Sequence, residues 1–324
     1  MTMSLLSDHM IASAILALAL LATACAGGDD VQPAAGSKQV TFKVRLDGID
    51  SRALSDGSQA TRLEAVAYDA SGKAVQVRSG LMTDLQGSVT FNLVEGVTYR
   101  FAFWAQSPSA TCYTLSNDYT AVAVDYSGTA NDDSRDAFFQ HIDSYTVGAS
   151  TAMQAVTLVR PLAQVDFVVA PDEWERVVRS TSPVTATGFT LPAGLYTRLN
   201  LLTGEVSAPT AQPVSLASAP VPTASTLQPD GSYRHTPMLV LDGSQYVWLS
   251  MGYVLAPPAP STSMLSQVAL AMTSGTAKAI TTIAVPSVPY KRNRRTVIVL
   301  SQLASKLQAG APQVNETSSI ISGD

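Results

Sequence analysis

The stretch YRFAFWAQ, residues 99–106, decides the fold. In a strand, Tyr99, Phe101 and Phe103 would lie on one face, because side chains alternate with a period of two. Trp104 breaks this alternation, which indicates that both faces are covered near the end of the strand. Coverage on both faces is typical of a central strand in a two-sheet sandwich. The stretch therefore predicts an all-β protein.

Other segments extend this prediction along the chain. Residues 40–46 alternate apolar and polar side chains and predict a half-buried strand. Residues 63–78 predict a hairpin around the turn at 69–72, whereas 171–178 predict a short helix with acidic residues in its first turn. Residues 207–227 are rich in Ala, Pro, Ser and Thr and predict a long surface loop. More strands are predicted at 89–94, 121–126, 158–169, 195–202, 246–255, 267–272, 279–285 and 296–300.

The length of 324 residues exceeds that of a typical sandwich and predicts two domains. Pro161 lacks a ladder donor, so the strand at 158–169 should cross a sheet edge or the domain junction. We place the boundary near residue 170. The predicted organisation is a signal peptide (1–24), a lipidated cysteine with its tether (25–39), an N-terminal sandwich (40–170), a C-terminal sandwich (171–304) and a polar tail (305–324).

Composition narrows the class of protein. Hydrophobic residues make up 46% and charged residues 14%, which suits a β-rich extracytoplasmic protein better than a helical cytosolic enzyme. The net charge is −5 without a dominant basic block, so nucleic acid is not expected as a partner. The local exception, the basic residues within 291–295, is interpreted as a solvated turn before a strand.

The amino terminus predicts export. Residues 11–24 are apolar but too short to cross a bilayer, so they indicate a signal-peptide core. The sequence LATAC at 21–25 resembles a bacterial lipobox, which implies cleavage before Cys25 and its acylation, with palmitate as one expected group. Two features depart from the pattern: Ala22 stands where leucine is usual, and no Lys or Arg precedes Ile11. An ordinary secretory signal with an incidental Cys25, and a misplaced start codon, stay open.

Four later motifs occur in a recognisable order. They are NDDSRDAFF at 131–139, LVRPLAQV at 158–165, NLLTGEV at 200–206 and PYKRNRRT at 289–296. Together with residues 99–106, they resemble the fimbrillin-like surface lipoproteins of Bacteroidales-type bacteria over most of 40–300. The resemblance implies two tandem Greek-key-like β-sandwich domains, without a cofactor. It also implies a location on the cell outer membrane, reached through the lipid anchor.

The resemblance also implies a route of assembly. In related fimbrillins, a protease cleaves after an arginine in the loop behind the first strand, and a strand from another subunit fills the groove left by that strand. Arg52-Ala53 occupies the matching place. An uncleaved arginine on a solvated loop is the alternative. No clear alternating donor strand follows Leu300, which favours an accepting tip subunit or an accessory protein.

Chemical motifs are sparse. His141 and His235 are far apart in sequence, and no metal-binding spacing, nucleophile elbow or phosphate loop is present. Cys112 is interpreted as a small core or loop residue rather than a nucleophile. A hydrolytic carboxylate pair assembled only by folding stays open. Asp132, Asp133 and Asp136 are interpreted as a polar loop balanced by Arg135 rather than a calcium site, and Tyr113, Tyr119 and Tyr126 as core rather than a sugar-binding surface.

The sequence therefore predicts a non-enzymatic, lipid-anchored surface protein of the fimbrillin type. Its predicted role is fimbria assembly, as a tip or accessory subunit, or adhesion to a host or glycan ligand. Its expected partners are the outer membrane and other fimbrial subunits. The alternative is a surface glycan-binding lipoprotein that does not polymerise.

Overall fold

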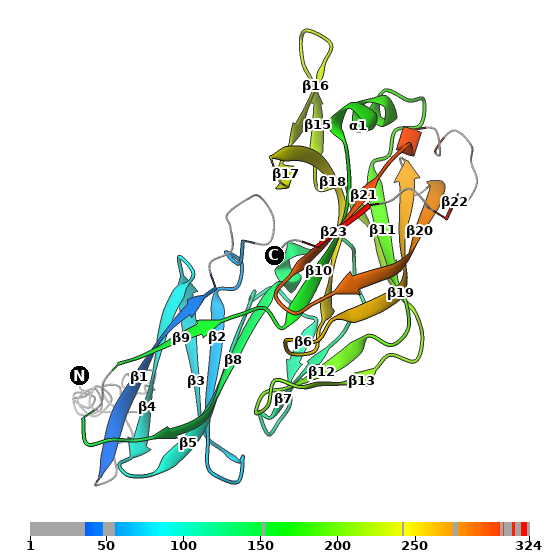
Figure 1. Ribbon diagram of the computed structural model, residues 1–324. Helices are drawn as coiled ribbons and strands as arrows, with labels where there is room; N and C mark the ends of the chain where they lie inside the picture. The colour runs from blue at the N-terminus through cyan, green and yellow to red at the C-terminus, as the bar shows by residue number, and fades with distance from the viewer. Residues whose placement is uncertain are drawn as a thin grey trace, which may run out of the picture. The chain divides into compact units, whose positions relative to one another are not determined.

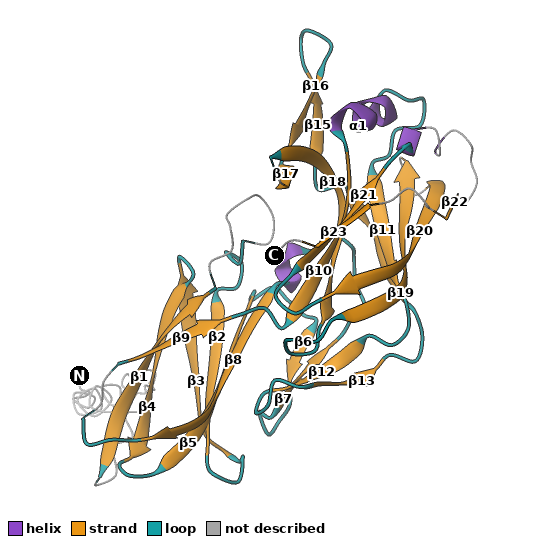
Figure 2. Cartoon of the chain, viewed as in Figure 1, coloured by secondary structure: helices purple, strands orange, loops and turns teal. Residues whose placement is uncertain are grey.

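The computed structural model describes residues 36–47, 56–150, 153–241, 243–274, 278–304, 307, 313–314 and 319–322. Strands form almost all of the regular structure, together with the helix α1 (Pro171–Val178) and the 3-10 turn η1 (Asp133–Arg135) (Figure 2). The predicted all-β fold class and the predicted helix are confirmed. The described ranges contain no helix with the length and apolar character that crossing a membrane requires. The chain divides into two units, and the strands from Lys38 onward belong to the second, Lys38–Asp324.

Seven strands follow the order β8-β5-β2-β3-β4-β1-β9 (Figure 1). β2 pairs antiparallel with β3, which confirms the predicted hairpin, and β1 pairs parallel with β9. Phe42 of β1 lies 4.7 Å from Phe101 of β5 between ring centroids, so these strands face one another across a core, as in a sandwich. The bounds are β1 (Ser37–Leu46), β2 (Arg62–Tyr68), β3 (Ala74–Thr83), β4 (Gln86–Val94), β5 (Thr98–Gln106), β8 (Ala137–Thr146) and β9 (Gln154–Leu158).

The strand β5 separates two hydrophobic cores. Tyr99, Phe101 and Phe103 belong to the first core, beside β1. Ala102 and Trp104 point to the other face and belong to the second core, where Trp104 is 1% exposed. The coverage of both faces predicted from residues 99–106 is therefore confirmed.

A nine-stranded sheet carries much of the second core, with β23-β21-β10-β18-β12-β7-β6 in order, β13 beside β12 and β17 beside β18. A five-stranded sheet has the order β14-β11-β19-β20-β22, and β15 pairs with β16 in a separate hairpin. The bounds in the first of these sheets are β6 (Tyr113–Leu115), β7 (Ala121–Val124), β10 (Leu162–Val169), β12 (Tyr196–Asn200), β13 (Val206–Pro209), β17 (Met238–Leu241), β18 (Ser244–Leu255), β21 (Arg295–Leu300) and β23 (Ser319–Ser322). The remaining strands are β11 (Ala186–Leu191), β14 (Val214–Pro220), β15 (Ala224–Leu227), β16 (Tyr233–Thr236), β19 (Ser263–Ser274), β20 (Lys278–Tyr290) and β22 (Gln313–Val314).

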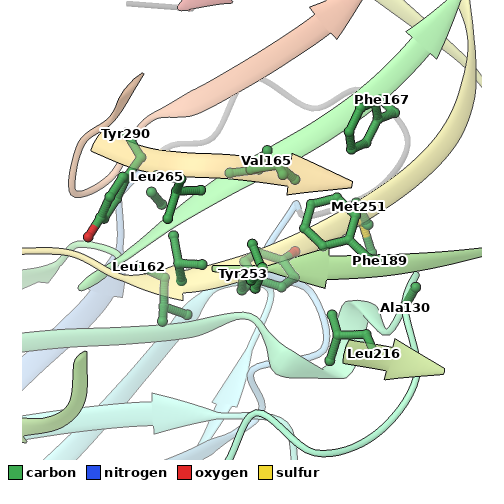
Figure 3. Close-up of a cluster of buried hydrophobic side chains, with 14 of the residues drawn as sticks. Ala130, Leu162, Val165, Phe167, Phe189, Leu216, Met251, Tyr253, Leu265 and Tyr290 are labelled. Atoms are coloured by element: carbon green, nitrogen blue, oxygen red, sulfur yellow. The ribbon is translucent and has the colours of Figure 1, made fainter. Parts of the chain in front are cut away.

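The second core lies between these sheets. Figure 3 shows Val165 and Phe167 of β10 near Phe189 of β11 and Met251 of β18. Phe167 and Phe189 meet edge to face with 5.5 Å between ring centroids. Every residue of β10 is buried, as expected for a strand that pairs with β18 on one side and β21 on the other and is covered on both faces.

The region around Pro161 separates two strands rather than interrupting one. β9 ends at Leu158 and pairs with β1, whereas β10 begins at Leu162 and pairs with β18 and β21. The boundary near residue 170 stays a prediction. Strands from both sides of that position share the nine-stranded sheet, because β6, β7 and β10 precede it and β12, β18 and β21 follow it.

The long surface loop predicted at 207–227 is wrong. That segment contains β14, which pairs antiparallel with β11, as well as most of β13 and all of β15. Leu216 is 4% exposed and faces the second core, while most of its neighbours in β14 are exposed. Small Ser and Ala side chains hide this half-buried pattern, because they add little hydrophobic contrast along the strand.

Candidate functional site

The strand β1 is the main candidate site, because it provides a complete row of the first core. Its inward-facing side chains are at most 4% exposed, and the alternation predicted at 40–46 is confirmed. These side chains are Val40, Phe42, Val44 and Leu46. The outward-facing Arg45 donates from Nε to Thr157 Oγ1 over 2.8 Å. β1 lies between β4 and β9 in the sheet, so main-chain pairing holds it on both sides.

Phe42 is the anchor of this strand. Its ring centroid lies 5.2 Å from that of Phe103, 6.0 Å from that of Phe91 and 6.0 Å from that of Tyr145. Aromatic pairs at such separations add to the free energy of burial. A main-chain ladder combined with alternating side-chain pockets is the arrangement by which proteins hold an added strand.

The segment that follows β1 is flanked on both sides by contacts to residues that are distant in the sequence. Asp47 N–H donates to Leu158 O over 2.8 Å, and Asn293 Nδ2 donates to Asp47 Oδ2 over 3.2 Å. After the segment, Gln59 Nε2 donates to Asp133 Oδ2 over 3.3 Å. The predicted cleavage site, Arg52-Ala53, lies outside the described residues, and so does the predicted lipidation site, Cys25.

A buried ion pair lies close to these contacts, in a region that we call the junction (Asp47, Asp136, Arg160 and Asn293). Arg160 donates to Asp136 through two hydrogen bonds of 2.6 Å, from Nε to Oδ1 and from Nη2 to Oδ2. The Arg160 guanidinium also lies 4.8 Å from the centre of the Phe138 ring. Asp136 is 2% exposed, so burial raises its pKa to about 6, while the nearby guanidinium counteracts that rise. Asp136 is therefore a structural carboxylate rather than part of a solvated loop.

The basic turn, residues 291–295, connects this junction to the second core. Asn293 Oδ1 accepts from Arg160 N–H over 3.3 Å. The Arg292 guanidinium donates to Ala256 O over 2.9 Å and to Gly204 O over 2.7 Å, and burial lowers its pKa to about 10. The interpretation of this cluster as a solvated turn is incomplete, because Arg292 is committed to backbone carbonyls.

A second buried carboxylate lies deeper in the same region. Asp166 is 0% exposed, accepts from Gln164 Nε2 over 2.8 Å and lies 3.2 Å from Arg295 Nε. Burial raises its pKa to about 6, opposed by the Arg295 charge. The Arg295 guanidinium lies 5.3 Å from the centre of the Trp248 ring. The charge of β10 is thus compensated by the basic turn.

The three tyrosines considered for sugar binding have structural contacts. Tyr126 is 4% exposed, and its hydroxyl donates to Tyr196 O over 2.7 Å. The Tyr113 hydroxyl donates to Arg135 O, and the Tyr113 ring lies 5.2 Å from that of Trp104. Tyr119 adopts a φ of 57° in a turn, where its carbonyl accepts from the Tyr68 hydroxyl. Tyr126 is thus a core residue, whereas Tyr113 and Tyr119 are half-buried and contribute to core and turn contacts.

Other reactive side chains are dispersed. Cys112 is buried and free, and burial raises the pKa of its thiol. His235 Nδ1 shares a hydrogen bond of 3.0 Å with Ser225 Oγ, which also accepts from Trp174 Nε1. His141 Nε2 lies 3.5 Å from Asp143 Oδ1. Within the ranges that the structure describes, His, Cys, Asp and Glu do not gather in groups of three or more that could hold a metal ion.

The ion pair of Asp136 with Arg160 was missed by the sequence reasoning. A signal for it was present, because Arg160 is a lone charge between the apolar residues Val159 and Pro161-Leu162. A lone charge in such a setting needs a buried partner. The sequence could not identify which of the surrounding carboxylates that partner is.

Solved structures of proteins from Bacteroides and Parabacteroides are similar to this chain at low sequence identity. A proposed polysaccharide-binding protein from Bacteroides thetaiotaomicron superposes with a TM-score of 0.45 at 10% identity, covering 82% of this chain and 92% of the other. A fimbrial assembly protein from Parabacteroides distasonis gives 0.41 at 11% identity, covering 89% and 96%. A proposed cell adhesion protein from Bacteroides eggerthii gives 0.42 at 11% identity, covering 88% and 95%. No curated protein matches the chain.

A family model, in contrast, matches the sequence of this chain. It matches residues 33–311, which include both cores and the basic turn. Because the match covers most of the length, the chain belongs to the family of unknown function DUF6562.

Proposed function

We propose that this protein is a lipid-anchored surface protein of the fimbrillin type, which accepts a strand from another subunit as a tip or accessory component of a fimbria. The observation that carries the proposal is the placement of β1. Its four inward side chains fill the first core, and the chain continues past Asp47 into the segment that contains Arg52. Cleavage there would separate β1 covalently from β2, and dissociation of β1 would then leave a groove of matching pattern.

The strand pairing supports this role in a second way. β9 pairs with β1 in parallel, from Phe42 opposite Gln154 to Leu46 opposite Leu158. An incoming strand could use the same ladder partners without a change elsewhere in the seven-stranded sheet. The proposed location is the surface of the outer membrane, where the acylated Cys25 anchors the uncleaved protein; cleavage after Arg52 separates Cys25 from β2 and the strands that follow it. The proposed partners are other fimbrial subunits.

An arginine-specific protease tests the proposal. We expect mass spectrometry of the treated protein to find a cut after Arg52, and we expect the Arg52→Gln variant to stay intact at this position. SDS-resistant ladders after cleavage would identify a polymerising subunit. Cleavage without ladders is the result expected for an accepting tip or accessory subunit.

An intact wild-type chain would contradict the assembly role. It would favour the second candidate, a glycan-binding lipoprotein that does not polymerise. Labelling with a palmitate analogue tests the anchor separately, and the Cys25→Ser variant should lose the label. A wild-type chain that takes up no label would overturn the proposed anchor.

A further inference from the structure

A pocket of about 590 Å³ opens beside the basic turn. Its walls are residues 289–294, the segment 259–262 between β18 and β19, and Val159 and Thr296. None of the described residues that line it is acidic. Pockets of this size hold small ligands, and their few polar groups select the ligand.

The four cations of the basic turn fall into two pairs. Arg292 donates to Ala256 O and Gly204 O, and Arg295 compensates Asp166, so both are committed to the fold. Lys291 and Arg294 are exposed, and neither side chain forms a hydrogen bond or ion pair with any described residue. Both line the pocket. Two positive charges are thus available to a ligand, on a protein whose net charge is −5.

The backbone between these two cations is held firmly. Asn293 adopts a φ of 56°, donates from its backbone N–H to Leu162 O over 2.9 Å and uses its side chain on Asp47 and Arg160. Arg294 O accepts from Gln164 N–H over 3.0 Å. A fixed backbone lowers the ordering cost when the two side chains close on a ligand.

The segment 259–262 adds hydroxyl groups and apolar surface to the lining of the pocket. Ser261 and Thr262 are exposed and line the pocket together with Pro260. Hydroxyl groups both donate and accept hydrogen bonds, and guanidinium groups match the geometry of oxyanions. We propose that this pocket binds a small ligand bearing a sulfate, phosphate or carboxylate group, either free or carried on a saccharide, with Lys291 and Arg294 holding the charge. This inference is independent of strand acceptance, because none of these residues belongs to β1.

Calorimetric titration of the purified protein tests this site. The probes are inorganic sulfate, galactose 6-sulfate and galacturonate, each at low ionic strength. We expect at least one probe to bind, and its affinity to fall as sodium chloride rises, because exposed charges are screened. Tighter binding of a saccharide than of inorganic sulfate would assign the ligand to the saccharide class, whereas equal binding would assign it to the free ion.

Variants decide whether the pocket is responsible. Lys291→Gln with Arg294→Gln should weaken binding at least tenfold. The matched control is Arg198→Gln with Arg234→Gln, which removes the same charge from two exposed residues elsewhere and should bind as the wild type does. Thr262→Trp, which places a larger side chain at the pocket without a change in charge, should also weaken binding. The proposal is overturned if no probe binds the wild type, or if the pocket variants and the control bind equally.

Discussion

The two hydrophobic cores are held together by different means. In the first core, aromatic rings dominate, and one strand, β1, contributes Phe42 to a cluster with Phe91, Phe101, Phe103 and Tyr145. In the second core, the fully buried strand β10 carries Asp166, which is compensated from the basic turn. Contacts in the first core depend on shape and apolar area, which another strand of the same pattern could reproduce. Contacts around the second depend on charged partners in fixed places.

Under the proposed function, the first core and the region around the second core have different roles. A region that exchanges a strand needs side-chain pockets and free ladder positions, and the first core offers both once β1 is removed. The region that supports the first core needs to keep its shape during the exchange of the strand. The ion pair of Asp136 with Arg160 and the contacts of Asn293 provide that fixed support.

The largest expected effect is on the first core. Phe42→Ala should lower the free energy of unfolding by about 4 kcal/mol, because the substitution loses the transfer free energy of a fully buried ring and leaves a cavity in its place. Urea denaturation measures this loss. Lys43→Ala, on the exposed face of the same strand, is the matched control and should change stability by less than about 0.5 kcal/mol. Equal effects of the two substitutions would show that β1 does not anchor the first core.

The next effect is on the junction. Arg160→Met should cost about 3 kcal/mol, because it leaves the Asp136 carboxylate buried without its partner. Adding Asp136→Leu should recover most of the lost stability, since an apolar pair needs no charge compensation. Denaturation of both variants gives the coupling energy. A double variant that is less stable than Arg160→Met alone would contradict this account of the pair.

The pH dependence of stability should also differ between the first core and the region around the second core, because Asp166 belongs to the latter. Burial raises the pKa of Asp166 from its ordinary 3.8 to about 6, so the folded state binds this proton more strongly than the unfolded state does. Its contribution to stability is therefore fully present below about pH 4 and is lost as the pH rises through 6.

A comparison with a neutral variant isolates this contribution. The stability of the wild type minus that of Asp166→Asn should fall by on the order of 2 kcal/mol between about pH 4 and pH 7.5. The first core should not contribute, so Phe42→Ala should shift the whole pH profile of stability without changing its slope. A wild-type advantage that stays constant or grows with pH would contradict the assignment.

The smallest expected effect distinguishes the cations of the basic turn. Arg292→Ala should cost about 1–2 kcal/mol, because Ala256 O and Gly204 O lose a charged donor. Lys291→Ala should change stability by less than about 0.5 kcal/mol. Thermal denaturation of the two variants under identical conditions measures the difference. A greater loss for Lys291→Ala would show that this side chain serves the fold rather than a ligand.

Local patterns predicted the strands better than the contacts between them. The alternation at 40–46 and 99–106 fixes which side chains point inward, because the period of a strand is two. The strand β14 was missed, since Ser and Ala soften the alternation around Leu216. Its formation depends on pairing with β11, a tertiary contact that local propensity does not contain.

The candidate site was predicted only in its local parts. The position of β1 before Arg52 follows from the sequence, as does the basic character of residues 291–295. The distribution of roles among the four cations does not follow from the sequence. Arg292 and Arg295 find partners far away in sequence, at Gly204 and Asp166, and only the fold determines which charges are left over.

The most direct test of the central claim is strand replacement in the first core. After cleavage at Arg52 and inactivation of the protease, a fluorescent peptide with the sequence of residues 37–47, SKQVTFKVRLD, is added in excess and its co-elution with the protein is measured. We predict that cleaved protein takes up this peptide, whereas uncleaved protein and the Phe42→Ala peptide give little or no uptake. Equal uptake by cleaved and uncleaved protein, or none by either, would contradict the claim that β1 is a replaceable strand.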